Sequence, residues 1–326
     1  MGERIINNSY SVLISWPIKD EYMQKLKDEF LNLHFVRCVD PTEMFLYVED
    51  TDIMFAGKLQ REHFIRAKKL KWLQLHGHGV DSYLFPELKA SDVLLTNASQ
   101  VHSIPMAEHV FAMLLFHTRR LKGLTEAQKQ NSWIKNELYH EFTELYKKTM
   151  LLVGVGNIGK EVAKRAKAFG MKVWGVRRNP RKENKYVDKM YSFNELEDAI
   201  NGADYIILSL PATSETISLF GKRVLQAMKE NALLINIGRG SVIAEHELID
   251  FLSNHPTNSA ALDVFEVEPL PPTSKLYQMD NVFVSPHVSG ISPAIQERQY
   301  EIFRSNLNKF LNGEKLDNLV EKNLGY

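Results

Sequence analysis

Short apolar runs alternate with polar, helix-like segments in the first part of the chain. Their length, and the Gly or Asn at which most of them end, predict buried strands at residues 10–16, 52–57, 71–77 and 92–97. Residues 20–32 have the pattern of a helix, with Asp20 expected as its N-cap. Strands that alternate with helices in this way predict a parallel sheet covered by helices.

The alternation resumes with stronger apolar runs in the second part of the chain. A long helix with one buried face is expected over residues 104–121, and an irregular segment with a short helix over residues 127–146. Strands are expected at residues 149–155, 171–176, 204–211, 231–238, 259–265 and 281–286, and helices at residues 195–200, 245–254 and 293–312. The pattern as a whole predicts two α/β domains that resemble each other.

Composition limits the partners and the location that we expect. Hydrophobic residues make up 44% of the 326 residues, enough for a sizeable core, and 40 basic residues balance 40 acidic ones. Zero net charge gives no reason to expect nucleic acid as a partner. The single cysteine, Cys38, cannot form an internal disulfide, and the apolar run at residues 11–16 is too short to cross a membrane. We therefore expect a cytoplasmic protein with no metal site and no membrane partner.

Gly154, Gly156 and Gly159 have the G-x-G-x-x-G spacing of a dinucleotide-binding turn. Ordinary tight turns also show this spacing, but here an apolar strand precedes it, and a helix and a second strand follow. In that context Gly154 permits the turn, Gly156 lets the backbone approach a pyrophosphate, and Gly159 lets the helix pack against its strand. The first N–H groups of the helix then face the phosphates, so we expect a dinucleotide cofactor.

Two arginines follow the second strand of this segment, where a carboxylate is usual. A carboxylate there accepts hydrogen bonds from the adenosine ribose and favours NAD, whereas Arg177 and Arg178 suit the 2′-phosphate of NADP. Two charge-assisted hydrogen bonds of about 1.5–3 kcal/mol each give on the order of 100-fold preference. We predict NADPH/NADP as the cofactor, with NADH bound more weakly. The alternative interpretation is a pair of solvated surface arginines.

Three later segments, taken together with the glycine turn, closely resemble the D-2-hydroxyacid dehydrogenase family; they are residues 234–249, 260–271 and 282–290. Residues 73–81 and 106–115 are similar to that family's substrate loop and to the first helix of its nucleotide domain. The resemblance therefore covers most of the chain. It implies an oxidoreductase that reversibly transfers a hydride between NADPH and a small 2-keto acid, giving the D-2-hydroxy acid.

The resemblance also implies an architecture. Both domains are expected to be Rossmann-like, doubly wound parallel-sheet domains. Residues 101–287 are expected to form the dinucleotide-binding domain, and residues 1–100 with 288–326 a discontinuous, flavodoxin-like substrate domain. A homodimer is expected through the nucleotide-binding domain, by way of the long helix and the irregular segment after it.

The family's catalytic trio corresponds to Arg239, Glu268 and His287. Arg239 follows an apolar strand, where a cation can hold the substrate carboxylate and polarise the carbonyl. His287 follows another strand at the same edge, and an imidazole can donate a proton in reduction and accept one in oxidation. Glu268 directly precedes a proline, as the family's acid does, and would orient the imidazole. Taken singly, each residue also has an ordinary structural interpretation as a surface or loop side chain.

Further contacts are implied by the resemblance alone. Cofactor contacts are expected from Asn157, Ile158, Leu210, Pro211, Thr216, Ile237, Gly238, Asp263, Ser289 and Gly290, with Asp263 accepting from the nicotinamide carboxamide. The backbone at Gly77, His78 and Gly79 is expected to hold the substrate carboxylate together with Arg239. The family usually has a small residue in place of His78, so this side chain either narrows the pocket or points to solvent.

Other proteins of this fold remain as alternatives. A formate dehydrogenase pairs glutamine with the histidine, so Glu268 argues against that activity. A phosphite dehydrogenase keeps a similar trio, and the motifs do not separate it from the main hypothesis. A nucleotide-sensing corepressor also shares the fold, but the absence of an acid at Arg177 argues against it, and the complete trio argues against an inactive binding module. The side chain of the 2-keto acid stays open.

Overall fold

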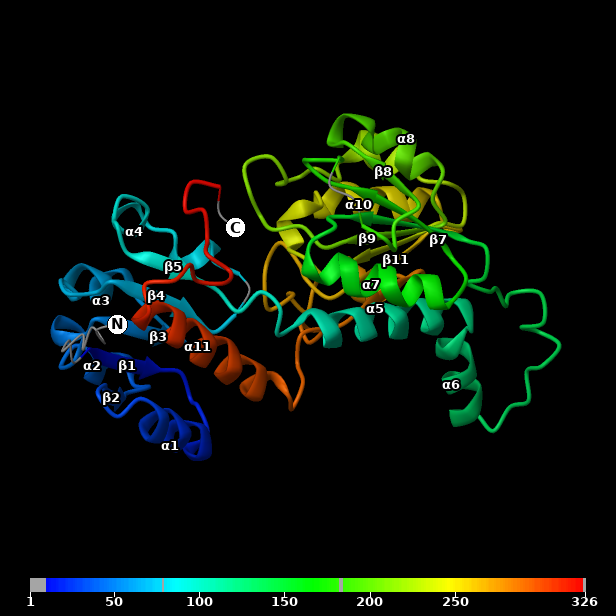
Figure 1. Ribbon diagram of the computed structural model, residues 1–326. Helices are drawn as coiled ribbons and strands as arrows, with labels where there is room; N and C mark the ends of the chain where they lie inside the picture. Colours follow the sequence, from blue (N-terminus) through cyan, green and yellow to red (C-terminus); the bar gives the residue numbers. More distant parts are fainter. Residues whose placement is uncertain (1–9, 78, 182–183, 325–326) are drawn as a thin grey trace. The chain divides into compact units, whose positions relative to one another are not determined.

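The chain folds into two compact units, each built on one sheet with helices around it (Figure 1). The computed structural model describes residues 10–77, 79–181 and 184–324. Unit 1 consists of residues 1–102 and 292–326, and unit 2 of residues 103–291. All strand pairs in both sheets are parallel, so the predicted fold class of two doubly wound α/β sheets is confirmed.

The sheet of unit 1 has five strands in the flavodoxin-like order β2-β1-β3-β4-β5. The strands are β1 (Ser11–Ser15), β2 (His34–Arg37), β3 (Ile53–Ala56), β4 (Trp72–Leu75) and β5 (Leu94–Thr96). The helices are α1 (Asp20–Glu29), α2 (Pro41–Met44), α3 (Arg61–Arg66), α4 (Pro86–Lys89) and α11 (Ile295–Leu311), with 3-10 turns η1 (Val48–Asp50) and η2 (Asp81–Tyr83). Every residue of β3 and β4 is buried, as expected for strands covered on both faces.

The last helix of the chain completes unit 1. Alternate side chains of a strand point to opposite faces, and Phe55 and Trp72 lie in the cluster that α1 and α11 cover. Phe303 of α11 stacks on both, with ring centroids 4.8 Å from Phe55 and 5.4 Å from Trp72. This buried aromatic contact fixes α11 to strands that precede unit 2 in the sequence, which explains why unit 1 is discontinuous.

The sheet of unit 2 has seven strands in the order β12-β11-β10-β9-β6-β7-β8, an extended Rossmann order. The strands are β6 (Thr149–Val153), β7 (Lys172–Val176), β8 (Lys189–Tyr191), β9 (Tyr205–Leu208), β10 (Leu233–Asn236), β11 (Ser259–Leu262) and β12 (Val282–Val284). The helices are α5 (Ser103–Thr118), α6 (Leu121–Lys129), α7 (Asn157–Ala168), α8 (Leu196–Asn201), α9 (Lys222–Gln226) and α10 (Glu245–Asn254), with 3-10 turns η3 (Phe193–Glu195), η4 (Gly240–Val242) and η5 (Lys275–Gln278).

Both faces of this sheet are packed. Met150 and Leu152 of β6 join the cluster that includes α5 and α7, whereas Leu151 and Val153 join the cluster that includes α8, α9 and α10. Figure 1 shows α5 and α7 side by side on one face. The central strands are therefore rigid, and the loops at their carboxyl ends have a fixed base.

Several boundaries differ from the sequence expectation. The helix expected over residues 104–121 breaks at Arg120, whose φ of 50° is left-handed, so α5 and α6 are separate helices. Asp20 was expected as an N-cap and is not one, because Lys19 holds that position and Asp20 instead pairs with Arg37 at 2.5 Å. Among the described residues, no helix is long and apolar enough to cross a membrane.

Candidate active site

The glycine turn joins β6 to α7 at the carboxyl edge of the seven-stranded sheet. Gly154 has a φ of 103°, and a Cβ there would lie 2.9 Å from the Ser209 carbonyl oxygen. A Cβ on Gly159 would overlap the Gly154 carbonyl oxygen, so both positions require glycine. A Cβ on Gly156, in contrast, would meet nothing within 4 Å, and no described side chain caps α7 there. The open space and the uncapped helix start fit a cofactor pyrophosphate.

Arg177 and Arg178 come directly after β7, beside the glycine turn. The Gly154 N–H donates to the Val176 carbonyl at 3.0 Å, and the Arg177 N–H donates to the Tyr191 carbonyl at 3.2 Å. The Arg178 guanidinium pairs with the Glu215 carboxylate at 2.6 Å. Sequence reasoning missed Glu215, because an exposed glutamate in a loop carries no pattern.

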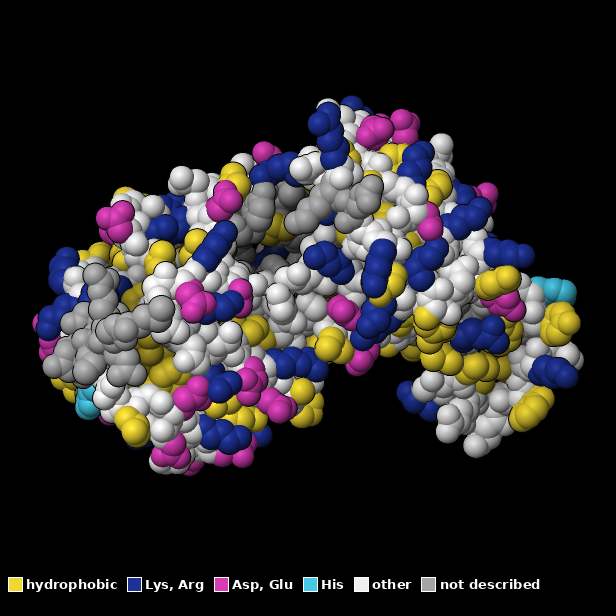
Figure 2. All heavy atoms as spheres, in the orientation of Figure 1, with side chains coloured by type: hydrophobic (Ala, Val, Ile, Leu, Met, Phe, Trp, Pro, Cys, Tyr) yellow, Lys and Arg dark blue, Asp and Glu magenta, His cyan; other side chains and the backbone are white. Residues whose placement is uncertain are grey.

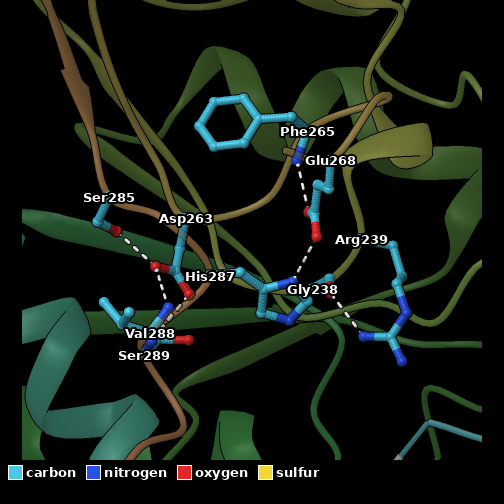
Figure 3. A network of polar contacts seen from close by, with 9 residues as sticks. All are labelled: Gly238, Arg239, Asp263, Phe265, Glu268, Ser285, His287, Val288 and Ser289. Carbon is cyan, nitrogen blue, oxygen red and sulfur yellow. Dashed lines mark hydrogen bonds and ion pairs between the residues drawn. The ribbon is translucent and has the colours of Figure 1, made fainter. Parts of the chain in front are cut away.

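His287 and Glu268 lie in contact after β12 and β11 (Figure 3). The Nδ1 of His287 is 2.7 Å from Oε2 of Glu268, and the other carboxylate oxygen accepts from the Phe265 N–H at 3.0 Å. The glutamate is thus held by the backbone while it holds the imidazole. His287 has a φ of 55°, an unusual conformation for a histidine, and its side chain is 52% exposed. Oriented in this way, the ring can present Nε2 to a ligand.

Arg239 follows β10, in a turn that a buried asparagine clamps. The side chain of Asn236 accepts from the Gly238 N–H and donates to the Arg239 carbonyl, both at 3.0 Å. Arg239 Nη1 donates to the Gly238 carbonyl at 2.9 Å. A Cβ on Gly238 would lie 2.6 Å from the Leu210 carbonyl oxygen, so the turn packs closely on the loop after β9. Asn236 thereby fixes the point from which the arginine emerges.

Asp263 is fully buried and holds the loop that carries His287 (Figure 3). One carboxylate oxygen accepts from Ser285 Oγ at 2.5 Å and from the Val288 N–H at 3.0 Å, and the other accepts from the Ser289 N–H at 2.9 Å. The His287 N–H donates to the Asp263 carbonyl at 2.8 Å. His109 of α5 lies 3.1 Å from Ser285 Oγ. Sequence reasoning missed the serine and this histidine, because hydrogen-bond clamps leave no regular pattern.

Several residues that were predicted to contact the cofactor have side chains buried inside unit 2. Ile158 and Ile237 belong to the core that includes α5 and α7, so their side chains pack inside the unit. The Thr216 hydroxyl donates to the Pro211 carbonyl at 2.6 Å and accepts from the Thr213 N–H at 2.8 Å. At these positions the backbone, and not the side chain, is available to a cofactor.

Gly77 and Gly79 lie in unit 1, after β4, at the carboxyl edge of the five-stranded sheet. His76 beside them stacks on Trp16 at 4.0 Å, and burial lowers the pKa of its imidazole. Gln299 of α11 donates to the His76 carbonyl at 2.7 Å and accepts from the Trp16 indole at 3.0 Å. His78, which was also predicted to contact the substrate, lies outside the described residues. The other predicted site residues lie in unit 2.

No metal centre accompanies these residues in the described part of the chain, where no three His, Cys, Asp or Glu side chains are grouped to hold an ion. The residues that unit 2 places after its strands are a histidine held by a glutamate, an arginine and a glycine turn that fits a dinucleotide. A hydride-transferring cofactor combined with an acid–base histidine is suited to redox chemistry at a carbonyl group.

Curated relatives agree with this chemistry. A D-3-phosphoglycerate dehydrogenase of Methanocaldococcus jannaschii is 30% identical over 95% of this chain, although the chain spans only 59% of that relative's length. A glyoxylate reductase of Pyrococcus horikoshii is 31% identical over 95% of this chain and 96% of its own.

Solved structures give the same result for the fold. A D-isomer specific 2-hydroxyacid dehydrogenase family protein of Aeromonas salmonicida has a TM-score of 0.86 and 32% identity, covering 97% of this chain and 100% of that chain. An NADPH-dependent glyoxylate/hydroxypyruvate reductase of Sinorhizobium meliloti, in complex with NADP and sulfate, has a TM-score of 0.83 and 26% identity, covering 98% and 100%.

The family model for the NAD binding domain of D-isomer specific 2-hydroxyacid dehydrogenases matches residues 111–289, more than half of the chain. The match spans the glycine turn and the segments that contain Arg239, Glu268 and His287. The chain belongs to the D-isomer specific 2-hydroxyacid dehydrogenase family and is an NAD(P)-dependent enzyme that interconverts 2-keto acids and 2-hydroxy acids.

Proposed function

We propose that the enzyme reduces a small 2-keto acid to the D-2-hydroxy acid and prefers NADPH to NADH. The observation that carries the cofactor preference is the pair Arg177 and Arg178 directly after β7, where a carboxylate would favour NAD. A guanidinium offers parallel N–H donors that form charge-assisted hydrogen bonds with a phosphate. An uncharged ribose hydroxyl forms weaker hydrogen bonds with the same donors. The preference that two such contacts support is on the order of 100-fold.

The size of the substrate is proposed from the relatives. The Pyrococcus horikoshii relative is a glyoxylate reductase, and the Sinorhizobium meliloti protein is a glyoxylate/hydroxypyruvate reductase. Glyoxylate carries only a hydrogen on its carbonyl carbon and hydroxypyruvate carries a hydroxymethyl group, so both are very small 2-oxo acids. We assign this enzyme the same substrate class, with glyoxylate and hydroxypyruvate as the first compounds to assay.

Arg239, Glu268 and His287 have distinct proposed roles. Arg239 binds the substrate carboxylate and polarises the adjacent carbonyl, because its guanidinium offers a fixed positive charge. His287 donates the proton from Nε2 to the developing alkoxide, and Glu268 holds Nδ1 at 2.7 Å, which fixes the orientation of the ring. When bound, the reduced nicotinamide supplies the hydride to the carbonyl carbon.

The remaining predicted contacts complete the proposal. Unit 2 binds the cofactor, with the backbone at Gly156 and the start of α7 next to the pyrophosphate. Asp263 anchors the His287 loop through the Ser289 N–H, and it remains the residue proposed to accept from the nicotinamide carboxamide. Unit 1 binds the substrate carboxylate through the backbone around Gly77 and Gly79. The boundaries proposed for the substrate domain remain residues 1–100 with 288–326.

A homodimer through unit 2 is part of the proposal. The segment formed by α6 and residues 130–146 exposes large apolar side chains, with Trp133 89% exposed and Tyr139, Leu124 and Leu121 also accessible. Figure 2 shows hydrophobic side chains gathered over this part of unit 2. A cavity of about 910 Å³ lies between this segment and the amino ends of β9 to β12. Such surfaces usually mark protein contacts, so a dimeric mass in light scattering is expected, and a monomeric mass would contradict it.

Steady-state kinetics tests the function directly. The purified enzyme is assayed with glyoxylate, hydroxypyruvate, pyruvate, a branched-chain keto acid and phenylpyruvate, each with NADPH and with NADH. The proposal predicts the highest kcat/KM for a short 2-keto acid with NADPH, at least tenfold above the value with NADH. Equal values with both cofactors would remove the NADPH preference, and a maximum with a bulky keto acid would remove the proposed substrate class.

A further inference from the structure

The loops that follow β7 and β9 meet beside the glycine turn. In the sheet, β6 pairs with β7 on one side and with β9 on the other, with Val153 in register with both Val176 and Leu208. Arg178 follows β7 and Glu215 follows β9, so their ion pair at 2.6 Å links loops from the two strands that flank the glycine-turn strand. A ligand that reaches Arg178 must therefore also approach Glu215.

The backbone around Glu215 is held in place by hydrogen bonds. It lies in a turn where the Thr216 and Ile217 N–H groups both donate to the Thr213 carbonyl at 3.0 Å. The Thr216 hydroxyl ties this turn to Pro211, and the Thr216 side chain is buried. At the start of the same loop, Ser209 Oγ donates to the Gly154 carbonyl at 3.0 Å. The backbone around Glu215 is thus anchored to the glycine turn itself.

We propose that Glu215 is a specificity-determining residue that competes with the cofactor's 2′-phosphate for the Arg178 guanidinium. With NADH, the Arg178–Glu215 ion pair stays intact. With NADPH, the phosphate must take the guanidinium from the carboxylate, and the two anions then lie close to each other. Glu215 thereby weakens the discrimination in favour of NADPH that the arginine pair provides. This inference rests on the proposed function, in which the arginines bind the 2′-phosphate.

The exposure of the pair makes the exchange possible. The side chains of Arg178 and Glu215 are 47% and 66% exposed, so water screens their attraction, and a doubly charged phosphate can displace the carboxylate. Exposed pairs of this kind change equilibria by about fivefold at most, and relief of the repulsion between the phosphate and the carboxylate adds to that. Replacing the carboxylate by an amide is therefore expected to increase discrimination about three- to tenfold.

The test compares two cofactor fragments by calorimetric titration of the full-length enzyme. Adenosine 2′,5′-bisphosphate carries the 2′-phosphate, and adenosine 5′-monophosphate lacks it. The Kd of the monophosphate divided by the Kd of the bisphosphate therefore isolates the contribution of the 2′-phosphate. The variant is Glu215→Gln. The matched control is Glu197→Gln, which removes a glutamate from another exposed Glu–Arg pair of unit 2, with Arg223 at 2.8 Å.

The ratio is expected to rise about three- to tenfold in Glu215→Gln and less than about twofold in Glu197→Gln. The gain should be clearly smaller when Arg178 is already replaced by Gln, because only the direct repulsion between the phosphate and the carboxylate then remains to be relieved. An unchanged ratio in Glu215→Gln, or a full gain without Arg178, overturns the inference. If the wild-type ratio is near one and Glu215→Gln raises it, the inference stands and the proposed NADPH preference fails. If neither protein discriminates, both fail.

Discussion

The carboxyl and amino edges of the seven-stranded sheet, where its strands end and begin, are lined by different kinds of side chains. At the carboxyl edge, buried polar groups hold the functional loops: Asn236 clamps the Arg239 turn, and Asp263 clamps the His287 loop. The amino edge borders the large cavity, which is lined by side chains such as Phe116, His117 and Leu138. Polar groups held in fixed positions are suited to catalysis, whereas an open, partly apolar surface is suited to contact with another protein chain.

This contrast shows how one sheet can separate ligand binding from assembly. In a parallel sheet all strand ends of one sense meet at one edge, so ligand-binding loops gather there. The opposite edge is then free to contact another molecule. Substitutions at the carboxyl edge should change turnover and cofactor binding without changing assembly, and substitutions at the amino edge should do the reverse.

Replacing His287 by Ala should lower kcat by at least about 1,000-fold, because the alkoxide then has no proton donor. The Kd for NADPH should stay within about twofold of the wild-type value, and the mass in light scattering should equal that of the wild-type protein. Turnover is followed by NADPH oxidation, and binding by calorimetry. A variant that keeps more than about a tenth of the wild-type kcat would contradict the catalytic role.

Replacing Asp263 by Asn should lower kcat about 100-fold, since a small misplacement of a catalytic group is enough for such a loss. The Asp263 carboxylate accepts hydrogen bonds from Ser285, Val288 and Ser289. The NH₂ group of an asparagine is itself a donor and cannot accept them, so the His287 loop must move. Ser285→Ala, which removes one of these donors, is the milder control. If Asp263→Asn turned over at the wild-type rate, the loop would not depend on this carboxylate.

Replacing Trp133 by Ser should weaken the proposed dimer about 30- to 100-fold, because burial of so large an apolar side chain contributes about 2–3 kcal/mol. The control is Ile217→Ser, which removes an apolar side chain that is 55% exposed in the loop after β9 at the other edge. Sedimentation equilibrium measures both. Equal dimer strength in the two variants would show that the amino-edge segment is not the interface.

Replacing Arg178 by Gln should weaken NADPH binding about tenfold and leave NADH binding within about twofold, since one charge-assisted contact with the phosphate is lost. Calorimetric titrations with NADPH and with NADH measure the two Kd values. Parallel weakening of NADPH and NADH would mean that Arg178 acts on a part that both cofactors share, and not on the 2′-phosphate.

His117 at the amino edge should make stability pH-dependent. Burial, and then the nearby charge of Arg120, lower the pKa of its imidazole from 6.5 to about 4. The unfolded chain therefore takes up the proton first, so the stabilising contribution is complete above about pH 6.5 and is lost as the pH falls toward 4. The free energy of unfolding should drop by about 1 kcal/mol between about pH 7.5 and about pH 5.5, and this drop should be absent in His117→Gln. An equal drop in both proteins would assign it to other groups.

The sequence was informative where burial is complete. Strands β3, β4, β6, β9 and β10 are buried along their whole length and appear as apolar runs. The edge strands β2 and β8 were missed because they are short and partly exposed. The break between α5 and α6 was missed because the left-handed conformation of Arg120 has no signature in an arginine. The family was predicted correctly, since its motifs recur in order along most of the chain.

The candidate site was predictable only in part. Glu268 and His287 could be chosen because motifs surround them, and their roles stay a prediction until the variants are measured. Asn236 and Ser285 could not be chosen, because their importance lies in hydrogen bonds between loops that are distant in sequence. Motif matching also could not separate side-chain contacts from backbone contacts, as Ile158 and Ile237 show by packing in the core.

The proposed cofactor preference can be tested directly by an equilibrium titration of the wild-type enzyme with NADPH and with NADH, followed by intrinsic tryptophan fluorescence. It requires no knowledge of the substrate. NADPH is expected to bind tens to about 100 times more tightly than NADH, because Arg177 and Arg178 bind the 2′-phosphate in spite of the competition from Glu215. Equal affinities would contradict this preference and would mean that the arginines after β7 do not take part in cofactor selection.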